Sequence, residues 1–321
     1  MNRFTAGLLV LALLAPLASA QTYPAKPVKI IVPAQPGGGL DLIGRTMADQ
    51  LGRSLEQPFI VENIGGAGGS IACQTVARAA PDGYTLMVGY VATHATGPAV
   101  RKVPYDPVRD FTPVAMIGGT RNMLVVHPTV PVSDVKGFTT YAREQAGKLK
   151  HGAGGVGTLT HLLMEQLKSA ASFDVVTAQY RGIGPAFQDM LGGQLDVMTP
   201  GLAAALPHIR SGKVKPLAVT GLARHPLLPN VPTFEESGFK GFDGVQWYGI
   251  VGPAKMSPEV TKKLGDEIGK ALAAPALQER LTAEAIEPMP MSPAQFGAYI
   301  QSELERYGTL ARERKIWIEK D

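Results

Sequence analysis

Short apolar runs alternate with segments of helical period along most of the chain. The run at 28–32 is typical of a buried strand, and after a proline–glycine turn at 36–39 apolar side chains recur at helical spacing between Leu42 and Leu51. Further strands are predicted at 59–62, 85–89, 123–126, 175–180, 195–198, 215–219 and 245–251, and further helices at 71–77, 136–145, 158–169, 185–191, 259–273 and 293–314. Repeated strand–loop–helix units predict an α/β fold with mostly parallel sheets and helices on both faces.

The predicted units fall into two α/β blocks, and the last helices follow without a sheet of their own. A chain of 321 residues is also too long for one compact core of the usual size. The simplest path leaves the first block near 122–126 and returns near 246–251. We therefore expect lobe 1 at 21–121 plus 247–321, lobe 2 at 122–246, and a ligand cleft at the hinge, since clefts between α/β lobes bind small ligands.

The first twenty residues have the three-part plan of a secretory signal peptide. Arg3 gives a positive start, an apolar run follows at 8–14, and small residues stand at Ala18 and Ala20. The apolar run is shorter than the roughly 20 residues that span a bilayer, so a retained membrane anchor is the less favoured interpretation. We expect cleavage after Ala20 and a periplasmic protein that is not embedded in the membrane. The sequence has no cysteine near this cleavage point, so we do not expect a lipid anchor.

Composition narrows the range of partners. The chain holds 31 basic and 27 acidic side chains and 6 histidines, a net charge of +4 with histidine neutral. No long basic run occurs, so nucleic acid is not an expected partner, whereas the weak positive excess suits a small anionic ligand. The single cysteine, Cys73, excludes an internal disulfide, and its apolar helical setting favours a small buried hydrophobe over a catalytic thiol.

Two glycine loops open predicted helices. Glycines 37–39 precede one helix, and the loop at 152–157 precedes the helix that starts at Thr158. Free backbone N–H groups at a positive helix end suit a carboxylate or a phosphate, although a plain tight connection is equally compatible with either loop. Asp41 is interpreted as the N-cap of its own helix, and a ligand-facing acid is the second interpretation.

Groups typical of catalysis are missing from the sequence. It contains no G-x-S-x-G motif, and no two histidines are spaced with a glutamate as zinc hydrolases require, so no metal, cofactor or enzyme activity is predicted. His94 and His161 lie where they could face the cleft, but local hydrogen bonding is the more common role. Arg181 follows a strand, where it could meet a carboxylate or remain a solvated surface side chain.

The loop at 152–157 also fits G-x-G-x-x-G, a dinucleotide-binding pattern. Its context argues against that function, because the short strand before it is polar and Asp174 precedes the next strand instead of ending it.

Several motifs together resemble one family, the solute-binding receptors of tripartite tricarboxylate transporters, also called Bug-type receptors. The matching segments are 23–27, 32–41, 61–69, 80–86, 104–111, 191–196, 228–233, 247–249 and 254–272. They occur in order and at family spacing over the whole chain after the signal peptide.

The resemblance implies a two-lobed, type II periplasmic binding protein fold that closes on its ligand. It implies a small carboxylate as ligand, which includes dicarboxylates, tricarboxylates, acidic amino acids and aromatic acids. The implied partner is a membrane permease, or a sensor kinase in some relatives, and the receptor is expected to be a monomer. Two functions of other classes stay open at this point, an exported enzyme and a structural protein whose cleft is unused.

The resemblance also places the ligand between loops 35–41, 91–96 and 154–161 and the strand ends near Tyr180 and Thr199. Backbone N–H groups, hydroxyls and bridging water are expected to hold it more than an arginine clamp. The ligand-binding residues expected on this basis are Gln35, Gly37, Gly38, Leu40, Asp41, Thr93, His94, Gly154, Gly157, Thr158, His161, Tyr180, Arg181 and Thr199.

Four positions depart from the usual family pattern. Leu40 replaces a hydroxyl residue, Gln35 replaces an apolar one, Thr199 with Pro200 follows where an acid or amide is frequent, and residues 96–98 are altered. The pocket is therefore expected to be less polar, and the ligand to be an aromatic acid or a longer diacid.

Overall fold

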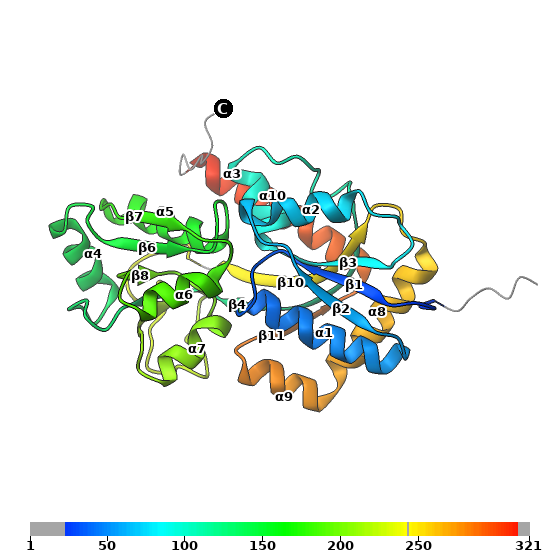
Figure 1. Ribbon diagram of the computed structural model, residues 1–321. Coiled ribbons are helices and arrows are strands. Elements are labelled where there is room, and N and C mark those ends of the chain that lie inside the picture. Colours follow the sequence, from blue (N-terminus) through cyan, green and yellow to red (C-terminus); the bar gives the residue numbers. More distant parts are fainter. Residues whose placement is uncertain (1–22, 243, 314–321) are drawn as a thin grey trace, which may run out of the picture.

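The computed structural model describes residues 23–242 and 244–313, and the predicted signal peptide lies outside them. The described chain forms two lobes side by side, each built on one sheet with helices around it (Figure 1). The order of the first sheet is β11 (Glu287–Met291), β4 (Phe111–Arg121), β10 (Val245–Pro253), β3 (Thr85–Tyr90), β1 (Val28–Val32) and β2 (Phe59–Asn63). The order of the second is β7 (Val176–Gln179), β6 (Lys150–Ala153), β8 (Val197–Met198), β5 (Met123–Val126) and β9 (Lys215–Val219).

Both sheets are mixed, which corrects the expectation of mostly parallel sheets. Five of the nine strand pairings in the described residues are antiparallel. The cause lies in the crossing between the lobes. Strand β4 carries the chain out of the first lobe, and β10 brings it back beside β4, so the two neighbours run in opposite directions. The sequence pattern indicated neither β4 nor β11.

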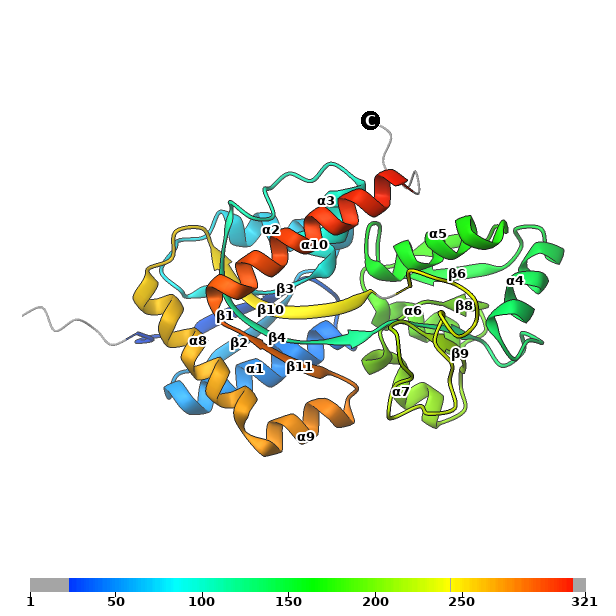
Figure 2. The same cartoon turned by 180° about the vertical axis from the view of Figure 1, so that it is seen from behind.

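Helices cover both sheets. They are α1 (Gly39–Leu55), α2 (Ser70–Ala77), α3 (Gly97–Val100), α4 (Val135–Glu144), α5 (Leu159–Ala171), α6 (Ile183–Leu191), α7 (Leu202–Arg210), α8 (Pro258–Ala273), α9 (Pro275–Ala283) and α10 (Pro293–Glu313), with a 3-10 turn η1 (Ala67–Gly69) and a π-helical turn η2 (Ala92–Thr96). The long α10 crosses one face of the first sheet (Figure 2). On the other face α1 packs closely, because Gly44 lies against Val32 and Val88.

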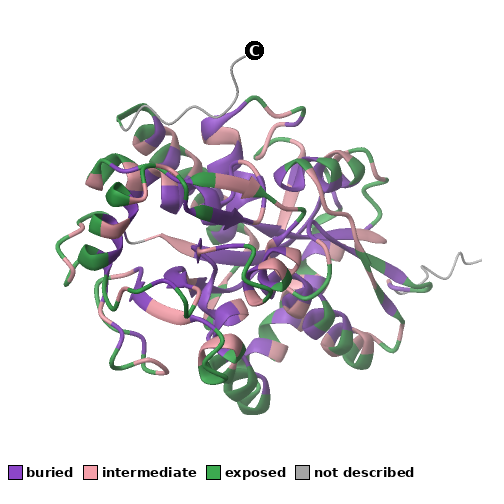
Figure 3. Cartoon of the chain, turned by 60° about the vertical axis from the view of Figure 1, so that its left-hand side comes forward, coloured by how far each residue is buried: buried purple, intermediate pink, exposed green. Residues whose placement is uncertain are grey.

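Each lobe has its own hydrophobic core. In the second lobe β5 separates two clusters, with Leu124 and Val126 on one face and Met123 and Val125 on the other. Buried residues follow the strands through the middle of both lobes (Figure 3). Cys73 is fully buried, and burial raises the pKa of its thiol to about 12. The thiol therefore stays protonated and unreactive at neutral pH, as expected for a structural cysteine. No helix in the described residues is both long and apolar enough to cross a membrane.

Candidate functional site

Five helices begin where the two lobes meet. They are α1 and α2 of the first lobe and α5, α6 and α7 of the second, and their N-cap residues are Gly38, Gly69, Thr158, Gly182 and Gly201. None of these residues caps its helix with a side-chain hydrogen bond. The first N–H groups of a helix have no partner within it and carry its positive dipole end. In α7 the N–H of Ala203 donates to Oγ1 of Thr120 at 3.1 Å, and the other four starts show no side-chain acceptor for these groups within the described residues.

The start of α1 touches the start of α6. The N–H of Gln35 donates to the carbonyl of Arg181 at 3.0 Å. A Cβ on Gly38 would stand 3.1 Å from Cγ2 of Ile183. Arg181 contributes to this contact through its backbone carbonyl, and the residue is exposed to solvent.

A glycine turn at 65–69 meets the loop ahead of α5. At Gly68, φ is +58° and a Cβ would stand 2.3 Å from the carbonyl oxygen of Val156. Nearby, the buried Oγ1 of Thr96 donates to the carbonyl of Gly157 at 2.7 Å. A side chain at Gly68 would be both strained and in collision, so glycine is needed for this approach. The lobes therefore touch at these two places and also where α7 meets β4, which is a closed arrangement.

Two tyrosines stand opposite each other on neighbouring strands of the first lobe, Tyr90 at the end of β3 and Tyr248 on β10. The Tyr248 hydroxyl accepts from Nε2 of Gln246 at 2.7 Å. It would lie 2.9 Å from a Cβ on Gly39, the first residue of α1, and Cβ of Ala203 in α7 is 3.9 Å from the same point. Burial raises the pKa of both phenols far above the ordinary value, so both stay protonated.

These helix starts and tyrosines together form the interlobe junction. It comprises residues 35–41, 65–69, 154–158, 181–184 and 199–203 with Tyr90, Gln246 and Tyr248. The tyrosines were not among the residues expected from the sequence. For Tyr90 a signal existed, because it ends a strand of an α/β sheet, and ligands bind at the carboxyl ends of such strands.

Asp41 holds the loop that precedes α1. Its carboxylate accepts from the N–H of Gly37 at 3.2 Å, from Nε of Arg45 at 3.1 Å and from Nδ2 of Asn63 at 3.0 Å. Burial acts to raise the pKa of Asp41, but these hydrogen bonds outweigh it and lower the pKa below its ordinary value. The predicted N-cap role is wrong, because Gly38 is the N-cap and Asp41 reaches back from the first turn.

The loop ahead of α5 is held by the first turn of its own helix. The N–H of Gly154 donates to Oγ1 of Thr160 at 2.9 Å, and the N–H of Gly157 points to Nδ1 of His161 at 3.4 Å. Burial lowers the pKa of His161 although Glu165 is near, so the ring accepts this hydrogen bond as a neutral imidazole. His161 therefore positions a junction loop.

The predicted threonine hydroxyls already donate within the protein. Thr93 donates to the carbonyl of Tyr90 at 3.0 Å, and Thr158 donates within its own loop at 2.7 Å. Thr199 donates to the carbonyl of Thr160. These hydroxyls shape the loops of the junction, so the predicted threonines leave backbone N–H groups and the two phenols as its uncommitted donors.

Three predicted residues turn away from the junction. Leu40 is buried in the core of the first lobe. His94 packs edge-on against Phe111 with ring centroids 4.8 Å apart, and burial lowers its pKa to about 3. Tyr180 donates to Asp189 at 2.6 Å, and burial, then Asp189, raises its pKa to about 12. The structure thus brings together Gln35, Gly37, Gly38, Asp41, Gly154, Gly157, Thr158, His161, Thr199 and the backbone of Arg181.

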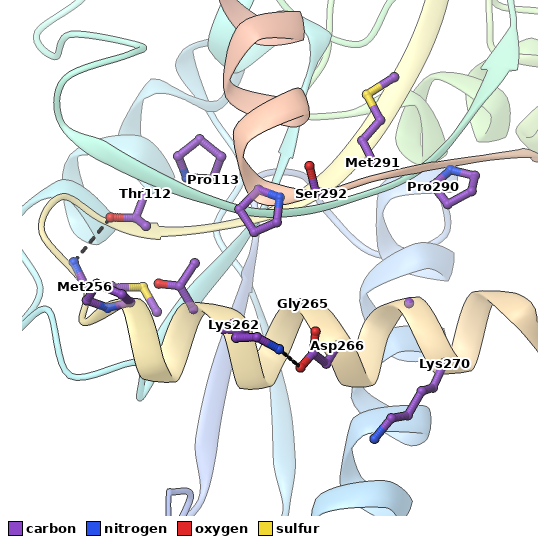
Figure 4. A pocket seen from close by; sticks show the side chains of 14 residues that line it. Thr112, Pro113, Met256, Lys262, Gly265, Asp266, Lys270, Pro290, Met291 and Ser292 are labelled. Carbon is purple, nitrogen blue, oxygen red and sulfur yellow. Dashed lines mark hydrogen bonds and ion pairs between the residues drawn. The ribbon is translucent and has the colours of Figure 1, made fainter.

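A separate groove lies on the outside of the first lobe, between α8, β4, β11 and the start of α10 (Figure 4). Its rim holds Lys262 paired with Asp266 at 2.6 Å. Every lining residue lies in or directly beside these elements of one lobe, so lobe closure does not enclose the groove. Within the described residues no cluster of His, Cys, Asp and Glu could hold a metal ion.

Known proteins match this architecture over most of its length. The model of the tripartite tricarboxylate transporter family receptor matches residues 43–316. Protein BugT of Bordetella pertussis is 34% identical over 299 residues, which cover 92% of this chain and 91% of BugT. The structure of R. palustris Rpa4515 with adipate has a TM-score of 0.89 at 30% identity and covers 92% of this chain and 99% of that one. The periplasmic binding protein BugD has a TM-score of 0.89 at 32% identity, covering 92% and 100%.

These matches confirm both the two-lobed α/β fold and the family that the sequence motifs resembled. They also decide against the exported enzyme, because the matched family consists of solute receptors of a transporter. The chain therefore belongs to the tripartite tricarboxylate transporter receptor family, a family of periplasmic solute-binding proteins.

Proposed function

We propose that this protein binds a small carboxylate at the interlobe junction and delivers it to the permease of a tripartite tricarboxylate transporter. The observation that carries the proposal is the convergence of five helix starts without side-chain caps. Backbone N–H groups at a positive helix end are suited to a carboxylate. The similar R. palustris receptor was solved with adipate, a linear diacid, which supports the same ligand class here.

The two lobes each contribute part of the proposed site. Residues 35–39 and 65–69 of the first lobe face 181–184 and 154–158 of the second. A diacid can therefore place its two carboxylates at helix starts of opposite lobes. We propose lobe limits of 21–121 plus 247–321 and 122–246, with closure about the two crossings between them, and a monomeric receptor.

Export is part of this proposal. Cleavage after Ala20 would release a periplasmic protein that starts at Gln21, which suits the family's location. N-terminal sequencing of the exported protein tests it, and a retained leader would contradict it.

A carboxylate sensor that feeds a two-component system is the second candidate, because it requires the same site. The genes next to this one discriminate between the two. Adjacent permease genes support transport, and an adjacent sensor kinase gene supports signalling.

The test is a thermal-shift screen of the purified exported protein against diacids, tricarboxylates, aromatic acids and acidic amino acids. A ligand at 100 times its Kd stabilises the folded state by about 2.7 kcal/mol. For a protein of this size that raises Tm by several degrees, at about 2 °C or more per kcal/mol. A shift confined to one class supports the proposal and identifies the ligand class. No shift with any acid contradicts it.

A further inference from the structure

We propose that Tyr90 and Tyr248 select the ligand, and that this ligand is a carboxylic acid without an ammonium group. The inference rests on the proposed function and narrows it, because acidic amino acids were among the ligands expected from the sequence. It depends on three features of the interlobe junction. They are the buried phenol of Tyr90, which has no hydrogen-bond partner, the phenol of Tyr248, whose proton has no acceptor, and the carboxylate of Asp41, which is already paired.

Tyr90 supplies the buried phenol without a partner. Its residue is 5% exposed, and within the described chain its hydroxyl makes no hydrogen bond to protein. The oxygen is absent from the fully enclosed polar atoms, so it still borders open space. Its ring lies 3.6 Å from where a Cβ of Gly69 would stand, beside the turn that meets the second lobe. A buried hydroxyl normally finds a partner, and a bound ligand would provide one.

Tyr248 supplies a second donor on the same face of the sheet. It stands directly opposite Tyr90 in the antiparallel β3–β10 pair, where facing side chains are neighbours. Its oxygen accepts from Gln246, and no acceptor for its own proton occurs within the described residues. Burial raises the pKa of both phenols, so each keeps its O–H proton at neutral pH. In this closed arrangement Tyr248 is fully buried, whereas Tyr90 keeps a small exposed surface. Two neutral donors suit an acceptor such as a carboxylate oxygen.

No carboxylate in the junction segments is free to pair with an ammonium group. Asp41 is the single acidic residue in the junction segments. Its carboxylate already accepts from Gly37, Arg45 and Asn63, and it forms an ion pair with Arg45 at 3.1 Å. The surrounding helix starts are positive and repel a cation. An α-ammonium group would therefore lose its hydration without gaining an ion pair.

Calorimetric titrations of the full-length exported protein with matched ligands test this proposal. The pairs are adipate with 2-aminoadipate and succinate with aspartate, because the members of each pair differ by one amine. We expect at least one diacid to bind and its amino partner to bind at least about tenfold more weakly. Tyr90→Phe and Tyr248→Phe should each weaken binding of that diacid about tenfold or more, since a hydrogen bond to a charged group is lost.

Tyr141→Phe is the matched control, because it removes a phenol hydroxyl from α4 on the outside of the second lobe. It should bind like the parent protein. Unfolding of each variant without ligand shows whether the fold is intact. Equal affinity for a diacid and its amino partner, or parental affinity in both junction variants, overturns the selection while the proposed function stands. If no acid in a panel extended to citrate and benzoate binds, the proposed function fails and the selection fails with it.

Discussion

Helices at the interlobe junction and helices at the outer ends of the lobes begin differently. On the outside, Asp134 accepts from the N–H of Gly137 at 2.7 Å to cap α4, and Ser257 accepts from the N–H of Val260 at 3.2 Å to cap α8. At the junction five helices start without such a cap. Figure 1 shows these helices arranged around the region between the lobes. Helices α3 and α9 also have none, but α3 directly follows η2 and α9 directly follows α8. Each cap is worth about 1 kcal/mol. Its absence leaves first-turn N–H groups for a ligand at the expense of stability, except at α7, where the N–H of Ala203 donates to Thr120.

The largest expected effect comes from blocking the junction. Gly68→Val places a branched side chain at a φ of +58°, where its Cβ would collide with the carbonyl of Val156. We expect ligand affinity to fall about 100-fold, near 3 kcal/mol, because the lobes no longer close. Calorimetry measures the affinity, and small-angle scattering measures the compaction on ligand binding.

Gly147→Val is the matched control for backbone strain. Its φ is +78°, and no atom lies within 4 Å of an added Cβ. It should lose stability but keep its affinity. If both variants bind equally well, contact at Gly68 has no part in closure.

A second variant converts a junction helix start into a capped one. Gly38→Asp puts a carboxylate at the N-cap of α1, where φ is −108° and ψ is 175°, a conformation open to any residue. The new charge competes with the ligand for the same N–H groups, so affinity should fall roughly tenfold, about 1.4 kcal/mol.

Gly38→Asn is its control, with nearly the same size and no charge. It should weaken binding less than Gly38→Asp does. Equal losses in the two variants would indicate a steric effect and leave the role of charge without support.

The reverse experiment removes an outer cap. Asp134→Ala should lower the free energy of unfolding by about 1 kcal/mol, because the N–H of Gly137 loses its acceptor. Ligand affinity should stay at the parental value. Urea unfolding measures the stability and calorimetry measures the affinity. A fall in affinity would contradict the comparison, because a capped outer helix would then also contribute to ligand binding.

The smallest expected effect concerns how the free energy of unfolding falls at acidic pH. Asp41 has a pKa below 3.8 in the folded state, so it stabilises the fold at neutral pH and loses this contribution as the pH falls through the folded pKa. Asp41→Asn should therefore lose less stability than the parent between about pH 5 and pH 3. Urea unfolding over this range checks it, and parallel curves would contradict the prediction.

Much of the fold could be predicted from the hydrophobic pattern, because strands such as β1 and β5 are short and largely buried. The missed elements have weak patterns. Strand β11 reads Glu-Pro-Met-Pro-Met at the sheet edge, where proline is tolerated because the lost N–H would face away from the sheet. Strand β4 contains Pro113 and adjacent glycines, and α7 contains Pro207. Pairing with neighbouring strands makes β4 and β11 regular, and packing in the fold, not local preference, does so for α7.

The candidate site was harder to predict than the fold. The glycine loops gave a usable signal, because their N–H groups do lie at helix starts. Leu40 was misplaced because it shares a helix stripe with Ile43 and Met47, and that stripe faces the sheet. Tyr90 and Tyr248 become neighbours only through the antiparallel pairing of β10, which the expectation of mostly parallel sheets left out.

The place of β10 between β3 and β4 also has a consequence for the order of synthesis. The strands on either side of it are made early, whereas β10 begins at Val245, after every strand of the second sheet. A nascent chain that ends before this point can complete the second sheet but holds the first as two unjoined pieces. The lobe that is begun first is therefore completed last.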